Sequence, residues 1–396
     1  MDLAPTAAQE AIRAECRAWL REHLPWEYGT GLPPRFELLD DEVAFGRSWQ
    51  AKLCQGRWVG VTWPESAGGR GLGALAHYVV QEELARARAP EIVGRIGINL
   101  VGPTLMAHGT AEQQRRWLPA ILSAELLFCQ LFSEPDAGSD LASLSTRADR
   151  VDGGWLLNGQ KVWTSYAQFA DHGLCLARSH PDTPKKQAGI TSFVVDMASP
   201  GVEVRPLKQI TGESDFNEVF LTDVFVGDND VIGTPGDGWR VSQSTLTHER
   251  GTNPRQLVIH SQHIEELLLL AERNGAFDDP RLARRLAQAA AEVRIFQLHN
   301  WRSLSRIEAG LPLGPEGSAL KLYWSEMSQR LHALALDILG PDAPLAHGAQ
   351  DSTGSGLAGD GEWQRSWLYY LSSSIFAGTN EIQRNIIGER VLGLPR

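Results

Sequence analysis

The stretch Cys129–Asp140 reads Cys-Gln-Leu-Phe-Ser-Glu-Pro-Asp-Ala-Gly-Ser-Asp and marks a change in the character of the chain. A strand-like apolar run, Leu126–Phe132, stops at Ser133-Glu134-Pro135. A proline restricts the residue before it to extended backbone, and Gly138 can adopt a positive φ. A turn of small residues with free N–H groups can bind anionic oxygens. The same pattern is also typical of an ordinary surface turn after a strand.

The size and charge of the chain exclude several classes of protein. Its 396 residues are enough for two or three domains with buried cores. The formal charge of −11 argues against broad binding to nucleic acid or to acidic membranes. Local arginines can still hold an anionic ligand in an acidic protein. No apolar run approaches the roughly 20 residues that span a bilayer.

The four cysteines, Cys16, Cys54, Cys129 and Cys175, form no CxxC pair and no metal-ligand spacing. We therefore expect reduced thiols, no metal site and a cytoplasmic protein. The first residues, Met1–Thr6, lack the charged and apolar regions of a signal peptide, which favours the same compartment.

The N-terminal third has the pattern of helices. Thr6 can open a capping box, and a helix is expected over Ala74–Arg88. Thr110 is a typical N-cap for a further helix, which we expect to end before Pro119.

The periodicity then changes to that of short strands. Asp152-Gly153 and Asn158-Gly159 are residue pairs typical of tight hairpin turns. Strand spacing of this kind is typical of a small antiparallel barrel or sandwich. The later strands are expected at His172–Ser179, Ile190–Asp196, Val202–Pro206 and Asn217–Val226.

The last third favours a bundle of long helices. Apolar residues recur there at steps of three and four. The expected helices are Trp239–Arg273, Arg281–Gly310, Glu316–Leu339 and Gly361–Leu394. The expected domains are a helical domain at 1–125, a small β-barrel domain at 126–235 and a helical bundle at 236–396.

Two further motifs complete a pattern that covers the chain. Asn-Gly-Gln-Lys-Val-Trp-Thr-Ser ends at Ser165, and Phe-Ala-Gly-Thr-Asn-Glu-Ile-Gln-Arg ends at Arg384. With Ser133–Asp140, in this order and spacing, they resemble the acyl-CoA dehydrogenase family. The resemblance implies a mainly α fold with a β middle domain, in which two α-domains surround a β-barrel and FAD lies at the junction.

The resemblance also implies a reaction. An acyl-CoA dehydrogenase forms a trans-2,3 double bond: a carboxylate removes the α-proton, and the β-hydride goes to the flavin. The substrate would be an acyl-CoA, and an electron-transfer flavoprotein would accept the electrons.

Matching the family motifs residue by residue gives the expected cofactor site. Ser165 stands where the family usually has Thr, and both offer a hydroxyl. Ser139 would face a phosphate of flavin or coenzyme A, or cap a helix; Trp163 would stack on the flavin ring, although a core tryptophan is the alternative. The expected flavin-binding residues are Gln130, Phe132, Ser133, Ser139, Trp163, Ser165, Arg273, Thr379 and Glu381.

The catalytic base is expected in the bundle. Many family members carry Glu before the Gly of the C-terminal motif, but this chain has Ala377, which cannot act as a base. The resemblance implies that a backbone N–H in the Ala377 region and a ribityl hydroxyl of the flavin polarise the thioester carbonyl. The isovaleryl-CoA and long-chain enzymes place a Glu-Arg pair on the first bundle helix, and Glu249-Arg250 match that pair. A solvated charge pair is the alternative reading, and His248 is a second candidate base.

Two family motifs are altered, and both contact flavin across subunits in the family. One survives only loosely as Arg273 and Phe277, and the other reads Asp337–Asp342 here. These features resemble actinobacterial dehydrogenases of sterol side-chain breakdown, which often form α2β2 assemblies. We expect a bulky, branched or steroid acyl-CoA and a homotetramer or α2β2 heterotetramer. The alternatives are a flavin-poor subunit of such a complex and an acyl-CoA oxidase.

Overall fold

The computed structural model describes residues 6–29, 36–249, 254–311, 314–344 and 361–395, and the side chains of 247–249 lie outside this description. The chain divides into two compact units, which we call the sheet unit and the bundle unit. The sheet unit comprises Ala14–His77 and Arg88–Glu249, and the bundle unit comprises Met1–Arg13, Tyr78–Ala87 and Arg250–Arg396. The expected three-domain boundaries stay a prediction.

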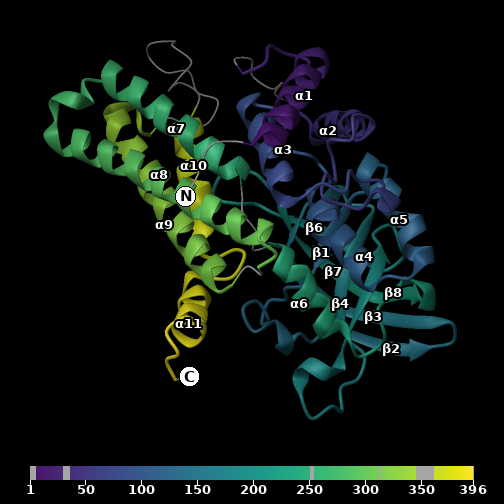
Figure 1. Cartoon of the computed structure of the whole chain (residues 1–396). Coiled ribbons are helices and arrows are strands. Elements are labelled where there is room, and N and C mark those ends of the chain that lie inside the picture. The colour runs from purple at the N-terminus through teal and green to yellow at the C-terminus, as the bar shows by residue number, and fades with distance from the viewer. Residues whose placement is uncertain (1–5, 30–35, 250–253, 312–313, 345–360, 396) are drawn as a thin grey trace. The chain divides into compact units, whose positions relative to one another are not determined.

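An eight-stranded sheet forms the core of the sheet unit (Figure 1). Its strands follow the order β6-β7-β3-β2-β4-β5-β8, and β1 pairs in parallel with β4. Apolar side chains such as Leu157, Phe193 and Val219 are fully buried in it, and each stabilises the fold by about 1.5–3 kcal/mol. The strands are β1 (Phe128–Leu131), β2 (Arg147–Val151), β3 (Gly154–Ser165), β4 (His172–Arg178), β5 (Ile190–Asp196), β6 (Val202–Leu207), β7 (Phe216–Gly227) and β8 (Val231–Ile232).

The two expected hairpin turns have different outcomes. Asp152 and Gly153 join β2 to β3 in a tight turn, and Gly153 has a φ of +73°. The prediction for Asn158-Gly159 is wrong, because both residues lie inside β3, where the pairing with β7 shifts register. A Cβ at Gly159 would lie 2.4 Å from Thr146 Oγ1, so the glycine permits a close approach of the neighbouring strand rather than a turn.

The expected end of one helix before Pro119 is also wrong. Helix α5 begins after Thr110, whose side chain forms a capping box with Gln113, and it continues through Pro119 to Ser123. The last turn places Ile121 and Leu122 in the core, 0% and 3% exposed. Their burial offsets the hydrogen bond that the proline cannot donate. The helices before the sheet are α1 (Ala7–His23), α2 (Leu39–Gln55), α3 (Ala74–Arg86), the π-helix η2 (Gly97–Val101), α4 (Gly102–His108) and α5 (Ala111–Ser123).

The C-terminal third is helical, as expected, and α9 spans Glu316–Leu339 as the sequence predicted. The expected helix Trp239–Arg273 is described as two helices, and residues 250–253 between them lie outside the described residues. The expected helix Gly361–Leu394 is wrong, because a turn interrupts it at Ala377 and Gly378, with φ of +53° and +84°. The helices are α6 (Gly238–Glu249), α7 (Pro254–Arg273), α8 (Pro280–Glu308), α9, α10 (Glu362–Leu371), the short η9 (Ser372–Ser374) and α11 (Asn380–Arg390), all visible in Figure 1 apart from η9.

The mainly α fold with a β-sheet middle part is therefore confirmed. Within the part of the chain that the structure describes, no helix is both long and apolar enough to cross a bilayer.

Candidate functional site

A buried ion pair joins the Ser133-Glu134-Pro135 turn to strand β3. Lys161 Nζ lies 2.8 Å from Glu134 Oε1, and the two side chains are 0% and 3% exposed. Lys161 also donates to the carbonyls of Phe132 and Leu176 at 3.2 and 2.7 Å. The second Glu134 oxygen accepts from the N–H and hydroxyl of Ser145. Both charges are thus fully paired, which a buried ion pair requires.

The Glu134 carboxyl stays ionised over the physiological pH range. Burial alone would raise the pKa of the Glu134 carboxyl, but Lys161 and the hydrogen bonds lower it to about 2. Ser133 O also accepts from Val162 N at 2.9 Å. The end of β1 and the last residues of β3 are therefore held side by side, although some thirty residues separate them in the sequence.

Trp163 leaves the sheet at an irregularity of β3. The pairing with β7 shifts register between Lys161 and Thr164, and Trp163 has a φ of +57°, which is rare for a bulky residue. Its ring is 62% exposed and meets Phe216 edge-on, with centroids 6.2 Å apart. The alternative of a core tryptophan is wrong, because the ring is exposed.

Ser165 follows Trp163 at the end of β3 and is half-buried. The next residue, Tyr166, again has a positive φ, and its N–H donates to Asp215 O at 2.8 Å. Two left-handed residues thus bracket Ser165 and fix the direction of this chain segment. Left-handed backbone at bulky residues is costly and tends to persist at functional positions.

The other expected residues of the sheet unit have different environments. Gln130 on β1 is half-buried, and Phe132, directly after β1, is buried. Ser139 is exposed and does not cap a helix, because Asp140 directly precedes the short 3-10 turn Leu141–Ser143. Asp140 instead accepts from Lys186 Nζ at 2.6 Å.

These residues fit the expected flavin. Trp163 presents an exposed aromatic face, and the hydroxyl groups of Ser133 and Ser165 lie on the segments beside it. A planar aromatic ring with polar edges can stack on such a face while its edge atoms meet hydroxyls.

Three expected residues belong to the bundle unit. Thr379 is the N-cap of α11, and its hydroxyl accepts from Ile382 N at 3.2 Å. Glu381 is exposed and pairs with Arg384. Arg273 is the exposed last residue of α7. A helix N-terminus attracts anionic groups, which suits the role expected for Thr379.

The expected base lies at the edge of the described residues. Glu249 is the last residue of α6, and its side chain, that of His248 and the whole of Arg250 lie outside the described residues. The helix itself is well anchored: Thr245 is fully buried, and its hydroxyl lies 2.8 Å from that of Thr104. The assignment of the base stays a prediction.

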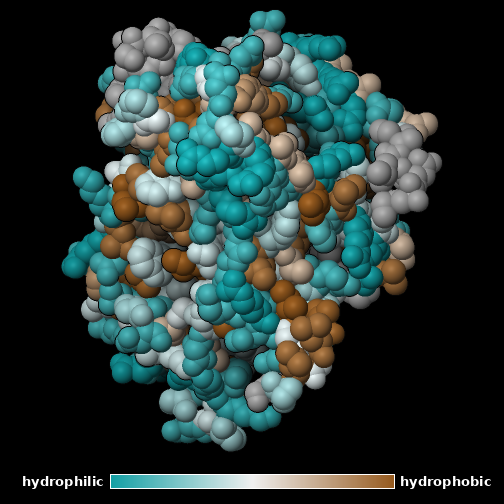
Figure 2. Space-filling view, turned by 90° about the vertical axis from the view of Figure 1, so that its left-hand side faces the viewer, coloured by the Kyte–Doolittle hydropathy of each residue, from teal (hydrophilic) through white to brown (hydrophobic). Residues whose placement is uncertain are grey.

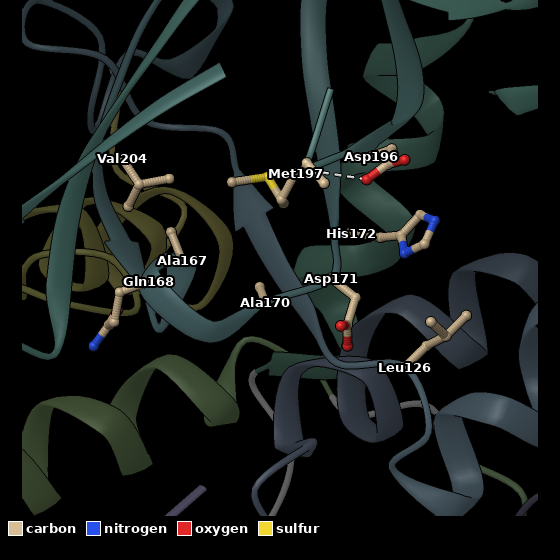
Figure 3. Close-up of a pocket in the computed structure, with 10 residues that line it drawn as sticks. Leu126, Ala167, Gln168, Ala170, Asp171, His172, Asp196, Met197 and Val204 are labelled. Atoms are coloured by element: carbon tan, nitrogen blue, oxygen red, sulfur yellow. Dashed lines mark hydrogen bonds between the residues drawn. The ribbon is translucent and has the colours of Figure 1, made fainter. Parts of the chain in front are cut away.

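A pocket of about 440 Å³ also occurs in the sheet unit (Figure 3). It adjoins the residues at which β1 and β4 begin, among them Leu126, Asp171 and His172. Gln130 and Ser133 lie toward the opposite end of the same parallel pair. No described residue of the expected cofactor site lines this pocket.

Glu134 and Lys161 lie inside the sequence motifs, but the motifs alone predicted no role for either residue. Lys161 directly precedes the apolar residues Val162 and Trp163, and this was the available signal, because a lysine is rarely buried without a partner. Nothing local pointed to Glu134 as that partner.

Comparison with known proteins gives a consistent result. Residues 6–125, 129–224 and 236–392 match models of the N-terminal, middle and C-terminal domains of acyl-CoA dehydrogenase. The chain is 40% identical to acyl-CoA dehydrogenase IpdE1 of Mycobacterium tuberculosis over 98% of each chain. A solved structure of the Tcur3481-Tcur3483 steroid ACAD matches with a TM-score of 0.84 and 29% identity over all of both chains. The ChsE4-ChsE5 complex from Mycobacterium tuberculosis matches with a TM-score of 0.82 and 30% identity, again over all of both chains.

Proposed function

Because the chain belongs to the acyl-CoA dehydrogenase family, we propose that it oxidises a bulky, branched or steroid side-chain acyl-CoA to the 2,3-enoyl-CoA. It is an FAD-dependent oxidoreductase acting on CH–CH groups, and FAD is its cofactor. Bound FAD supplies the acceptor for the hydride that leaves the β-carbon.

The observation that carries the proposal is the buried Glu134–Lys161 pair. It holds the Ser133 turn against the segment with the exposed Trp163 ring. We assign the hydroxyls of Ser133 and Ser165 to the polar edge of the flavin, with Gln130 and Phe132 beside the ring. Ser139 faces a phosphate of flavin or coenzyme A. Thr379, Glu381 and Arg273 contact the dinucleotide part.

Two further roles complete the reaction. The Ala377 N–H donates a hydrogen bond to the thioester carbonyl oxygen, which makes the α-proton more acidic. Glu249 removes that proton as the general base, and Arg250 braces the helix or a phosphate. A carboxylate at Glu249 is needed because Ala377 replaces the acid that many family members carry beside the Gly-Thr motif.

The substrate class rests on relatives and on the position of the base. One solved relative, matched over its whole length, is a steroid ACAD, and Glu249 matches the position used for branched and long acyl groups. The test is to supply the purified protein and FAD with a steroid side-chain CoA thioester, isovaleryl-CoA or butyryl-CoA and an artificial electron acceptor. We expect the steroid or branched thioester to react fastest, and fastest turnover of butyryl-CoA would refute this substrate class.

The same assay without an added acceptor separates a dehydrogenase from an oxidase. A dehydrogenase releases little hydrogen peroxide in air, because it passes its electrons to a protein such as an electron-transfer flavoprotein rather than to oxygen, and that acceptor is absent from this assay. Rapid peroxide formation would favour the oxidase alternative.

We propose that the enzyme acts as a tetramer, which is either a homotetramer or an α2β2 heterotetramer. One solved relative is the ChsE4-ChsE5 complex, and the altered motif at Arg273 and Phe277 favours the mixed form. Hydrophobic surface patches occur on the side shown in Figure 2, and such patches mark interaction surfaces. The exposed apolar residues of the bundle include Leu268, Leu269, Phe277, Ile295 and Leu298.

We place the enzyme in the cytoplasm. All four cysteines are free thiols, and Cys16, Cys129 and Cys175 are buried. Free buried thiols are typical of reducing compartments.

A further inference from the structure

The turn before α11 has an unusual backbone. Ala377 and Gly378 are both left-handed, with φ of +53° and +84°. Glycine adopts this conformation readily, but alanine does so rarely. Ala377 is therefore held in place by contacts outside the turn.

Those contacts come from two helices. Gln383 on α11 is 1% exposed, and its Nε2 donates to the carbonyls of Ala377 and Gly378 at 3.3 and 3.1 Å. Asn380 is 4% exposed, and its Oδ1 accepts from Ser325 Oγ at 2.9 Å and from Lys321 Nζ at 3.0 Å. Both of these donors lie on α9.

Lys321 is an improbable residue at this place for purely structural reasons. It lies beside the N-terminus of α11, where the helix dipole disfavours a cation. Burial lowers the pKa of Lys321 to about 8, although Glu381 acts in the opposite direction. A neutral donor such as a second serine would bind Asn380 without this cost.

The charged groups around Lys321 are otherwise occupied. Glu381 on α11 acts on it electrostatically and also pairs with Arg384. Arg384 bridges to Glu326 on α9, and at the start of α9 Glu316 pairs with Arg306 of α8. In the described part of the chain, Asn380 Oδ1 is the acceptor of the Lys321 ammonium.

We propose that Lys321 is a positioning residue, which fixes the Ala377–Gly378 backbone through Asn380 so that the Ala377 N–H faces the thioester carbonyl. This inference rests on the role proposed above for Ala377. A charged donor binds an amide oxygen more strongly than a neutral one, so the turn is held most firmly while Lys321 carries its proton. The effect belongs to the proton-removal step rather than to substrate binding.

The test compares the FAD-bound wild type with Lys321→Met. We expect kcat to fall about 10- to 100-fold, less than the roughly 10²–10³-fold cost of deleting an oxyanion donor, because the Ala377 N–H is misaligned rather than removed. KM and FAD content should be nearly unchanged. In the wild type kcat should decline as pH rises through about 8, and this decline should be absent in Lys321→Met. Lys321→Arg should recover part of the rate. Lys52→Met, an exposed lysine on α2, is the matched control and should behave as wild type.

Hydrogen exchange gives a second measurement that does not depend on activity. In Lys321→Met the backbone amide hydrogens of residues 376–383 should exchange faster, while exchange in the rest of the bundle is unchanged.

If Lys321→Met does not fold, a second variant replaces it. Ser325→Ala removes the neighbouring donor to Asn380 and should also lower kcat. A wild-type kcat in either variant, an unchanged pH profile in Lys321→Met, or faster exchange throughout the bundle would overturn the proposal. If the wild type oxidised no acyl-CoA, the function would fail, while the exchange result would still report on the turn.

Discussion

A single carboxylate decides the chemistry at the scale of the residue. Glu249→Gln keeps the shape and hydrogen bonding of the side chain but cannot accept the α-proton. We expect turnover to fall by about 10²–10⁴-fold, the usual loss when a general base is removed. FAD content, measured from the visible spectrum, should not change.

Two further variants make this prediction specific. His248→Gln should retain most of the activity, because the neighbouring histidine is assigned no proton transfer. Ala377→Glu in the Glu249→Gln background places a carboxylate at the family's other base position and should restore part of the rate. Near wild-type turnover by Glu249→Gln would show that the base is another residue, and His248 would then be tested first.

At the scale of the element, the Glu134–Lys161 pair ties the end of β1 to β3. Lys161→Met leaves the Glu134 carboxylate buried without its partner, which costs about 3–5 kcal/mol. We expect a lower free energy of unfolding in urea and weaker FAD binding, because the segments carrying Ser133 and Trp163 are no longer held together.

A double variant separates the loss of the charge from the loss of the contact. Glu134→Gln combined with Lys161→Met removes both charges and should recover part of the stability. Arg205→Gln breaks the exposed Glu203–Arg205 pair, whose side chains are 58% and 57% exposed, and should change stability little. If Lys161→Met had the same free energy of unfolding as Arg205→Gln and bound FAD as tightly as the wild type, the Glu134–Lys161 pair would not organise the site.

The bundle carries a second set of buried titratable groups, His260 and His332, both 0% exposed. Burial lowers the pKa of His260 to about 4, and burial with the neighbouring His260 lowers that of His332 to about 3. Below the ordinary histidine pKa of about 6.5, the unfolded chain binds protons at these two histidines, whereas the folded chain does not. The contribution of the two neutral histidines to the free energy of unfolding is therefore fully present above about pH 6.5 and is lost as pH falls toward 4.

The size of this loss follows from linkage. Each histidine should remove about 2 kcal/mol from the free energy of unfolding between about pH 6.5 and 5. We measure the free energy of unfolding in urea at several pH values. His332→Gln should reduce the slope of this free energy against pH by the contribution of one histidine. His299→Gln, at an exposed position of α8, is the control. An unchanged slope in His332→Gln would contradict the prediction.

The whole molecule is expected to assemble into four chains. Light scattering should give the mass of a tetramer, either for the chain alone or only after a partner chain is added. Leu298→Glu places a charge on an apolar bundle surface, where Leu298 is 41% exposed, and should weaken the assembly. Leu39→Glu, at an exposed apolar position of α2, is the control. A monomer with bound FAD would contradict the prediction.

Local signals in the sequence determined much of the fold. Strand β5 and helix α9 have the predicted bounds, Ile190–Asp196 and Glu316–Leu339. The capping residues Thr6 and Thr110 make the expected contacts with Gln9 and Gln113. Periodicity and capping depend on residues within a few positions of one another, so consecutive residues suffice to predict them. The family motifs likewise contained Ser133, Trp163 and Thr379.

Only the tertiary structure decided which residues far apart in the sequence contact one another within each unit. Lys161 finds Glu134 across 27 positions, Gly159 is required by the approach of Thr146, and Lys321 reaches Asn380 across 59 positions. Helix α5 continues past Pro119 because its last turn is buried in the core. In each case the deciding energy comes from burial or from a contact between segments far apart in the chain. No pattern in neighbouring residues records such a contact, because the partner is chosen when the chain folds.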